Sequence, residues 1–205
     1  MSKDILKVVQ RMNLQDVELQ LALQCASLIA GLKISNMLNL PASDISKVKQ
    51  ILKKSHITYE VLVIREGKAT LLLFDRKKLE NYIERAEVRE LLQKLGYEDT
   101  SFQDMIIRFQ ERYRRYAEEK CNFPHEVGLL LGYPVEDVKG FMINEGKNFL
   151  CVGYWKVYEK PEEKKRLFQQ YEVAENTMIQ MVSYGMHMVD IIDIYREKSN
   201  RCACV

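Results

Sequence analysis

The sequence predicts an α+β fold: a single helix-rich domain with a small, mainly antiparallel sheet of three to four strands. Three observations support this class. Apolar residues recur at helical spacing over most of the chain, two short apolar runs of strand length flank the turn at Glu66-Gly67, and no internal repeat or linker divides the sequence. We expect one domain over residues 1–195, followed by a flexible polar tail over 196–205.

The first half of the chain combines helical and strand patterns. Its apolar spacing predicts, in order, helices over 3–12, 14–30 and 43–54 and strands over 57–64 and 69–74. The stretch 28–40 fits either a short buried strand or the end of the second helix, with Gly31 as its cap. Ser43 is expected to be the N-cap of the next helix, and Glu66-Gly67 closes the two strands into a β-hairpin.

The second half is mostly helical. Its pattern predicts helices over 75–120 with a break at 96–97, short helices over 124–131 and 134–144, a strand over 148–158, a helix from 161, and a Met-rich helix over 174–195. Ser101 or Thr100 is expected to cap the long helix after the break, whose inner face has the spacing of a buried stripe. The run over 148–158 is apolar on both faces, so we place it centrally in the sheet.

Composition and charge exclude several classes of protein. The chain carries 31 Lys+Arg against 29 Asp+Glu, and this near-balance disfavours a domain that works by neutralising nucleic-acid phosphates. The basic stretch 112–116 has glutamates at helical spacing, which indicates a solvated, ion-paired face. No apolar run approaches the roughly 18 residues of a membrane span, and Lys3, Asp4 and Lys7 interrupt any signal peptide. We therefore expect a cytoplasmic protein, with neither nucleic acid nor a membrane as its partner.

The cysteines fit the same compartment. Their number is five, which is odd, and this predicts reduced thiols in a cytosol. Cys25 and Cys151 lie in apolar stretches, as small core residues do. Cys202 and Cys204 resemble a prenylation box only superficially and would supply half of a zinc site, so we interpret the tail as a frayed end.

The stretch around His125 carries the most chemical information. His125 and Glu126 fall in the first turn of a predicted helix, where the dipole favours an ionised carboxylate and a neutral imidazole. His125 is therefore a candidate general acid/base, with Glu126 or Asp137 to orient it. The alternative is structural: Glu126 closes a capping box and His125 bonds nearby. The second histidine that a zinc protease needs one turn later is missing, and we predict no metal site.

Two acidic residues begin the next helix. Glu136 and Asp137 follow Tyr133-Pro134 and are ordinary partners for the positive end of a helix dipole. A DNA-reading helix directs its first turn toward the groove, where acidic residues would meet phosphates. These residues therefore argue against a helix-turn-helix DNA reader.

A third segment is rich in aromatic residues. Trp155, the only tryptophan, stands between Tyr154 and Tyr158, with Lys156 beside it. An aromatic wall next to a lysine suits a planar or anionic ligand, although aromatic residues pack cores more often than they bind ligands.

Methionines and a histidine near the carboxyl end are candidate ligands of a haem or copper site: Met178, Met181, Met186, His187 and Met188. Methionines at helical spacing are far more often core residues. The sequence thus indicates no particular cofactor.

Three of these segments together resemble the signature of a bacterial family, the domain of unknown function 3793. They are 123–128 (FPHEVG), 132–141 (GYPVEDVKGF) and 153–158 (GYWKVY), and the segment 30–36, which contains Lys33, resembles that family's amino-terminal motif. The resemblance extends over about residues 14–171. It implies a cytoplasmic bacterial protein, chiefly of anaerobic Gram-positive organisms, and it implies no activity.

The signature is polar and aromatic where core packing alone would not require it, so we expect its residues to line one pocket. The first hypothesis is a binding or accessory protein whose cleft holds a small ligand: Tyr133 and Trp155 stack on it, His125 hydrogen-bonds it, and Lys156 or Lys33 supplies a countercharge. The second is an enzyme with His125 as general acid/base. The third is a docking module for a protein partner, which would present an exposed apolar patch rather than a hollow.

Overall fold

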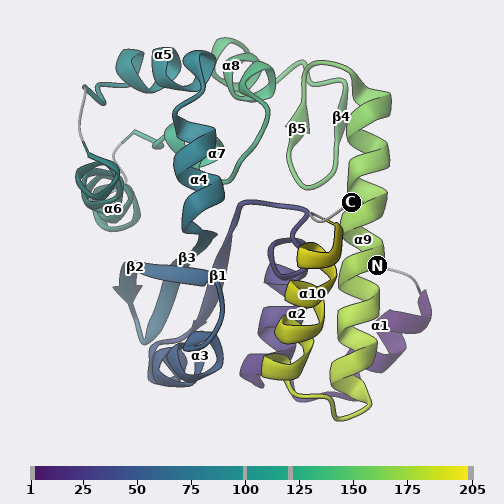
Figure 1. Ribbon diagram of the computed structural model, residues 1–205. Helices are drawn as coiled ribbons and strands as arrows, with labels where there is room; N and C mark the ends of the chain where they lie inside the picture. The colour runs from purple at the N-terminus through teal and green to yellow at the C-terminus, as the bar shows by residue number, and fades with distance from the viewer. Residues whose placement is uncertain (1–2, 99–100, 120–121, 203–205) are drawn as a thin grey trace. The chain divides into compact units, whose positions relative to one another are not determined.

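The computed structural model describes residues 3–98, 101–119 and 122–202, with side chains as far as residue 198 (Figure 1). It confirms the α+β class, because helices predominate and the strands form one three-stranded and one two-stranded antiparallel sheet. The chain divides into two compact units, Met1–Arg76 with Gln170–Val205, and Lys77–Gln169. The single domain expected over 1–195 stays a prediction.

The first unit is built on the three-stranded sheet. Its elements are α1 (Lys3–Val9), α2 (Val17–Ile29), β1 (Ser35–Pro41), the 3-10 helix η1 (Ala42–Asp44), α3 (Ile45–Leu52), β2 (Ile57–Arg65), β3 (Lys68–Asp75), the later part of α9 (Pro161–Ser183), and α10 (Met188–Cys202). The strand order is β1-β3-β2, and both pairs are antiparallel. Apolar side chains of α2, α9 and α10 share one core with those of β1 and β3.

Two turns of this unit follow from glycine. Glu66 and Gly67 have φ angles of 50° and 74°, as a two-residue hairpin loop requires, so the predicted hairpin is confirmed. Gly31, with φ 74°, follows the last turn of α2, and Leu32 N donates to Ser27 O there. The stretch 28–40 therefore contains both alternatives: a helix end capped by Gly31 and, from Ser35, a strand.

Two helix predictions in this unit are wrong. Ser43 is not the N-cap of α3, because η1 takes up residues 42–44 and the N-cap is Asp44, whose side chain makes no capping bond. The Met-rich helix expected over 174–195 is two helices, since the chain reverses at Gly185 with φ 84°.

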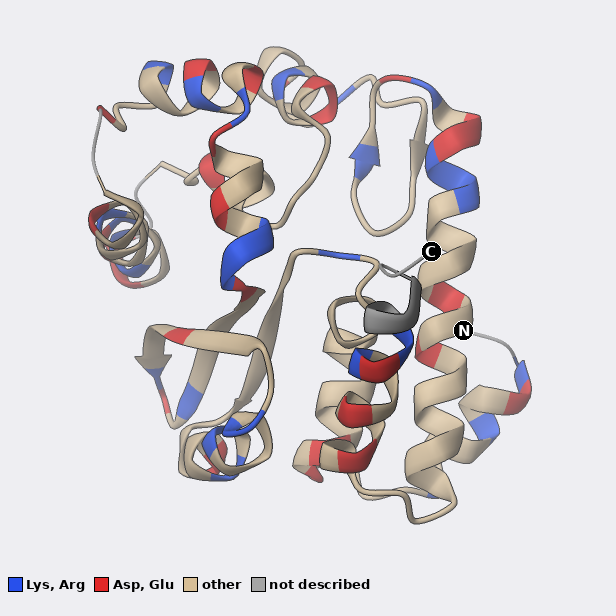
Figure 2. Cartoon of the chain, in the orientation of Figure 1, with Lys and Arg blue, Asp and Glu red and all other residues tan. Residues whose placement is uncertain are grey.

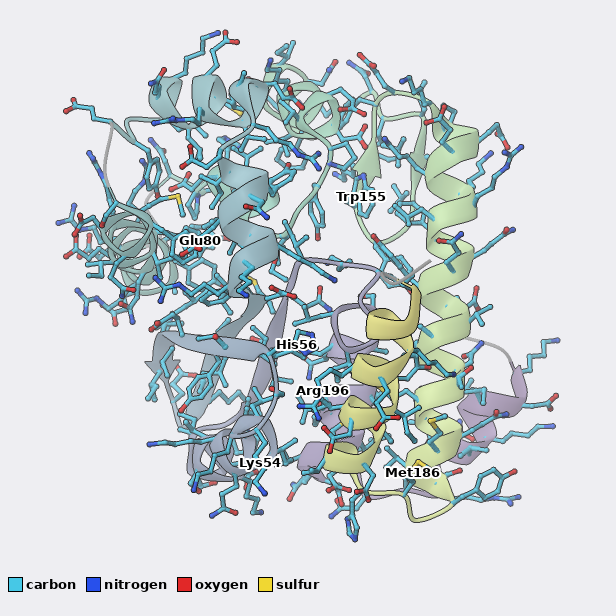
Figure 3. The ribbon with its side chains drawn as sticks, viewed as in Figure 1. Lys54, His56, Glu80, Trp155, Met186 and Arg196 are labelled. Carbon is cyan, nitrogen blue, oxygen red and sulfur yellow. The ribbon has the colours of Figure 1, made fainter. Side chains whose placement is uncertain are left out.

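Helix α10 continues to Cys202, so residues 196–202 of the expected tail are helical. Arg196 Nη1 donates to Lys54 O at 3.1 Å there (Figure 3). The side chains of Cys202 and Cys204 lie outside the described part of the chain.

The second unit holds the candidate site. Its elements are α4 (Arg76–Ile83), α5 (Ala86–Lys94), α6 (Phe102–Glu119), α7 (Glu126–Leu130), α8 (Val135–Ile143), β4 (Cys151–Val152), β5 (Lys156–Val157) and the first turns of α9. The predicted break at 96–97 is confirmed, with Gly96 at φ 88°. Ser101 Oγ accepts from Asp104 N and so caps α6, while Thr100 lies outside the described residues.

The strand predicted over 148–158 is wrong. The chain reverses at residues 153–155 and forms a hairpin in which Cys151 pairs with Val157 and Val152 with Lys156 (Figure 1). The segment looked apolar on both faces because its two halves face different surroundings: Val157 is fully buried, whereas Val152 is 58% exposed. Gly153 permits the reversal, since a Cβ there would lie 2.2 Å from Phe168 Cδ2.

Both units carry charges of both signs on their helices (Figure 2). Within the described ranges, no helix combines the length and the apolar character that crossing a bilayer requires.

Candidate functional site

A cavity of about 210 Å³ lies in the second unit, bordered by the start of α7, by α8 and by the loop of the β4–β5 hairpin. Most of the surface that lines it is apolar, and much of that is aromatic. Its walls include Phe123, His125, Tyr133, Phe141, Trp155 and Lys156. The three separated segments singled out in the sequence therefore border one hollow.

Trp155 and Tyr133 form one wall as a stacked pair. Their ring centroids are 4.8 Å apart with an interplanar angle of 26°, and Phe168 meets the other side of the indole edge-on at 4.6 Å. Trp155 is 8% exposed and belongs to the hairpin loop (Figure 3). Tyr82 OH donates to the carbonyl oxygen of Tyr133 at 2.6 Å, which fixes the turn between α7 and α8. These contacts hold both rings in place.

Asp137 anchors the hairpin to α8. Its carboxylate is 2% exposed and accepts three hydrogen bonds, from Trp155 Nε1 at 2.7 Å, Tyr158 N at 2.7 Å and Glu159 N at 3.2 Å. A buried carboxylate with this set of donors is a structural element that sets the indole orientation.

His125 is the N-cap residue of α7, and its Nδ1 is buried without a hydrogen-bond partner among the described residues. Its ring meets Phe123 at 5.5 Å and Phe141 at 5.9 Å, both edge-on. A buried polar atom without a partner costs free energy, which sets this nitrogen apart from hydrogen-bonded polar atoms of the site.

Glu126 is bonded to side chains other than His125. It is fully buried, and Oε1 accepts from Tyr97 OH and from Arg112 Nε, each at 2.9 Å. The capping-box interpretation is therefore wrong: the carboxylate binds these side chains of its own unit and does not return to a free backbone N–H at the helix start. Burial, followed by the charge of Glu126, raises the pKa of the Tyr97 hydroxyl well above its usual range.

The catalytic arrangement expected around His125 is not assembled by these contacts. Glu126 and Asp137 place their hydrogen bonds on other groups, and none joins either carboxylate to His125 in the described part of the chain. The candidate general acid/base therefore has no oriented carboxylate partner.

Lys156 also lines the cavity. Its Nζ donates to Gly146 O at 2.7 Å and lies 5.7 Å and 5.1 Å from the ring centroids of Phe141 and Phe149. Its ammonium group thus lies over two aromatic rings, and the side chain is half-buried.

Lys33 belongs to the first unit. It is 7% exposed and donates to Asn36 Oδ1, while Asn36 Nδ2 donates to Gln24 O. Burial lowers the pKa of its ammonium to about 8, although the nearby Cys25 opposes this shift. Burial raises the pKa of the Cys25 thiol to about 12, so Cys25 is an unreactive core residue, as predicted.

The methionines near the carboxyl end are largely core residues. Met178 and Met188 are fully buried in the first unit's core, and Met181 packs against it. Met186 is exposed, and His187 Nδ1 lies 3.4 Å from Glu18 Oε1.

Several residues of the site were missed. Phe123 and Phe141 line the cavity, and Tyr97 and Arg112 hold Glu126. A signal existed for Phe141, which lies one helical turn after Asp137 on the same face of α8. None existed for Tyr97, which is 29 residues from Glu126 in sequence.

The fold and the cavity define an α+β protein with an aromatic-walled pocket in its second unit. Residues 21–192, most of the chain, match the model of a family described as protein of unknown function (DUF3793), and the chain belongs to this family. No curated protein and no solved structure matches the sequence.

Proposed function

We propose that the protein binds a small planar molecule in the cavity between His125, Tyr133 and Trp155. One observation carries this proposal: His125, whose buried Nδ1 has no partner among the described residues, lines a hollow whose walls are largely apolar and rich in aromatic rings. Sites for small molecules combine such apolar walls with a few placed polar groups.

The size of the cavity limits the ligand. Apolar cavities of about 150 Å³ accept benzene, and pockets for drug-sized ligands begin near 300 Å³. A hollow of about 210 Å³ suits one aromatic ring with a small substituent, or a compact two-ring system. The rigid pair of Tyr133 and Trp155 offers such a ring a flat surface without a conformational cost.

The concave site supports a small-molecule ligand over the two alternatives. A docking module would need a broad exposed apolar patch, whereas Trp155 is buried and the signature residues surround a hollow. An enzyme in which His125 transfers protons would need an orienting partner, and the bonds of Glu126 and Asp137 supply none.

The single tryptophan makes binding directly measurable. Phenol, a one-ring probe with a hydrogen-bonding group, is expected to shift the Trp155 indole N–H resonance saturably at millimolar concentration. Val138→Phe, which adds a ring on the cavity wall, should abolish the shift. Ile143→Phe is the matched control, because it places the same ring on the same helix at an 80% exposed position.

The outcome decides the proposal. Saturable shifts in the wild type and in Ile143→Phe, but not in Val138→Phe, support binding in the cavity. No shift with phenol, or an equal shift in a folded Val138→Phe variant, rejects it.

Replacing His125 by phenylalanine should stabilise the protein. Most core substitutions destabilise, but this one removes a buried nitrogen that lacks a partner and keeps an aromatic ring beside an open cavity. We expect the free energy of unfolding, measured in urea, to rise by about 1 kcal/mol. Phenol binding should weaken, because the hydroxyl loses its partner. A loss of stability would mean that His125 is a satisfied structural residue.

A further inference from the structure

We propose that the ligand of this cavity is a small aromatic monoanion, whose ring lies against Trp155 and whose anionic group meets Lys156. This inference rests on the proposed function and specifies its chemical class. It follows from the charges that border the cavity and from how each is already bonded.

Among the residues that the structure describes, Lys156 has no carboxylate as a counter-ion. An ammonium group has three N–H donors, and the hydrogen bond that Lys156 makes, to Gly146 O, uses one of them. Within the described ranges, no carboxylate oxygen lies within 4.0 Å of its Nζ, whereas Lys164 on α9 and Lys147 in the adjacent loop each pair with a glutamate. Figure 2 shows positive charge on β5 and none on β4. An anionic ligand would supply the missing partner.

Among the described residues that line the cavity, no carboxylate is available to a cationic ligand. Asp137 is the acidic residue on its wall, and both of its oxygens already accept hydrogen bonds from the hairpin. A cationic ring would also approach the ammonium of Lys156 without a free carboxylate to offset the repulsion. The wall is therefore electrostatically selective for negative charge.

His125 and Lys156 border the same region of the wall. The imidazole centroid and the Lys156 Nζ lie 5.9 Å and 5.7 Å from the centroid of the Phe141 ring. A protonated ring nitrogen of His125 can donate to an anionic oxygen. A carboxylate near Phe141 would then have an ammonium and an imidazole as donors, while the attached ring occupies the aromatic part of the cavity.

Three probes of one size and different charge test the inference: benzoate, benzamide and benzylammonium, each titrated against the Trp155 indole N–H resonance at neutral pH. We expect benzoate to bind about tenfold more tightly than benzamide, and benzylammonium to bind least, since a charge-assisted hydrogen bond roughly doubles a neutral one. Added salt should weaken the binding of benzoate and leave the binding of benzamide unchanged, because salt screens the charge of the half-exposed Lys156.

Lys156→Met keeps the alkyl stem and removes the charge. The affinities of this variant for benzoate and for benzamide should therefore differ by no more than about threefold. Lys147→Met is the matched control, since Lys147 is 77% exposed and pairs with Glu145, and it should keep the benzoate preference. Equal affinities in the wild type, a preference for benzylammonium, or a benzoate preference that survives in folded Lys156→Met overturns the inference while the proposed function stands. If none of the three probes shifts Trp155, the proposed function fails as well.

Discussion

Asp137→Ala is expected to lower the free energy of unfolding by about 4 kcal/mol, because one buried and two partly buried donors lose their acceptor at once. The Trp155 indole N–H and the amides of Tyr158 and Glu159 all donate to this one carboxylate. The loss would free the hairpin from α8 and with it one wall of the cavity. Urea unfolding gives the magnitude, and a change in Trp155 fluorescence reports the altered indole environment.

Glu136→Ala provides the comparison on the same turn of α8. Glu136 pairs with Lys164 at 3.0 Å and its side chain is 32% exposed, so its loss should cost about 1 kcal/mol or less. If Asp137→Ala costs no more than Glu136→Ala, Asp137 does not anchor the hairpin.

The free energy of unfolding should gain a contribution of about 3 kcal/mol from Lys33 as the pH rises from 8 to 10.5. Burial holds the pKa of Lys33 at about 8 in the folded chain, against an ordinary value of 10.5. Between these values the unfolded chain binds a proton that the folded chain has released, so raising the pH stabilises the fold. Below pH 8 both states are protonated and the slope disappears.

The measurement compares the wild type with Lys33→Met over this pH range, because other groups titrate there too. The difference in unfolding free energy between the two proteins should change by about 3 kcal/mol in favour of the wild type. Lys53→Met is the control, because Lys53 is exposed in the same unit. The unfolding free energy of this variant should depend on pH as that of the wild type does. Parallel pH profiles for the wild type and Lys33→Met would show that burial does not lower the pKa of Lys33.

Local patterns predicted much of the fold. The hairpin around Glu66-Gly67 followed from strand propensity and a two-residue turn, and the helix boundary at Gly96 from glycine. The prediction of a strand over 148–158 was wrong because apolar residues on both faces are equally compatible with a central strand and with a half-exposed hairpin. The prediction of one helix across Gly185 failed because methionines occur at helical spacing on both sides of this glycine.

The site was predictable in its parts and not in its bonds. The residue types at 125, 133 and 155 indicated a pocket, and these residues border one cavity. The roles of the acidic residues depended on partners far away in sequence: Glu126 bonds Tyr97, and Asp137 bonds Trp155. Spacing along a helix carries no information about such partners, so the sequence left open whether these carboxylates orient His125 or hold the fold.

The most direct test of the central claim is to locate a bound ring by intermolecular nuclear Overhauser effects. With phenol at saturating concentration, the account predicts contacts from the phenol protons to the rings of Trp155, Tyr133 and Phe141. Contacts confined to exposed side chains such as Ile143, with none to these three rings, would contradict it.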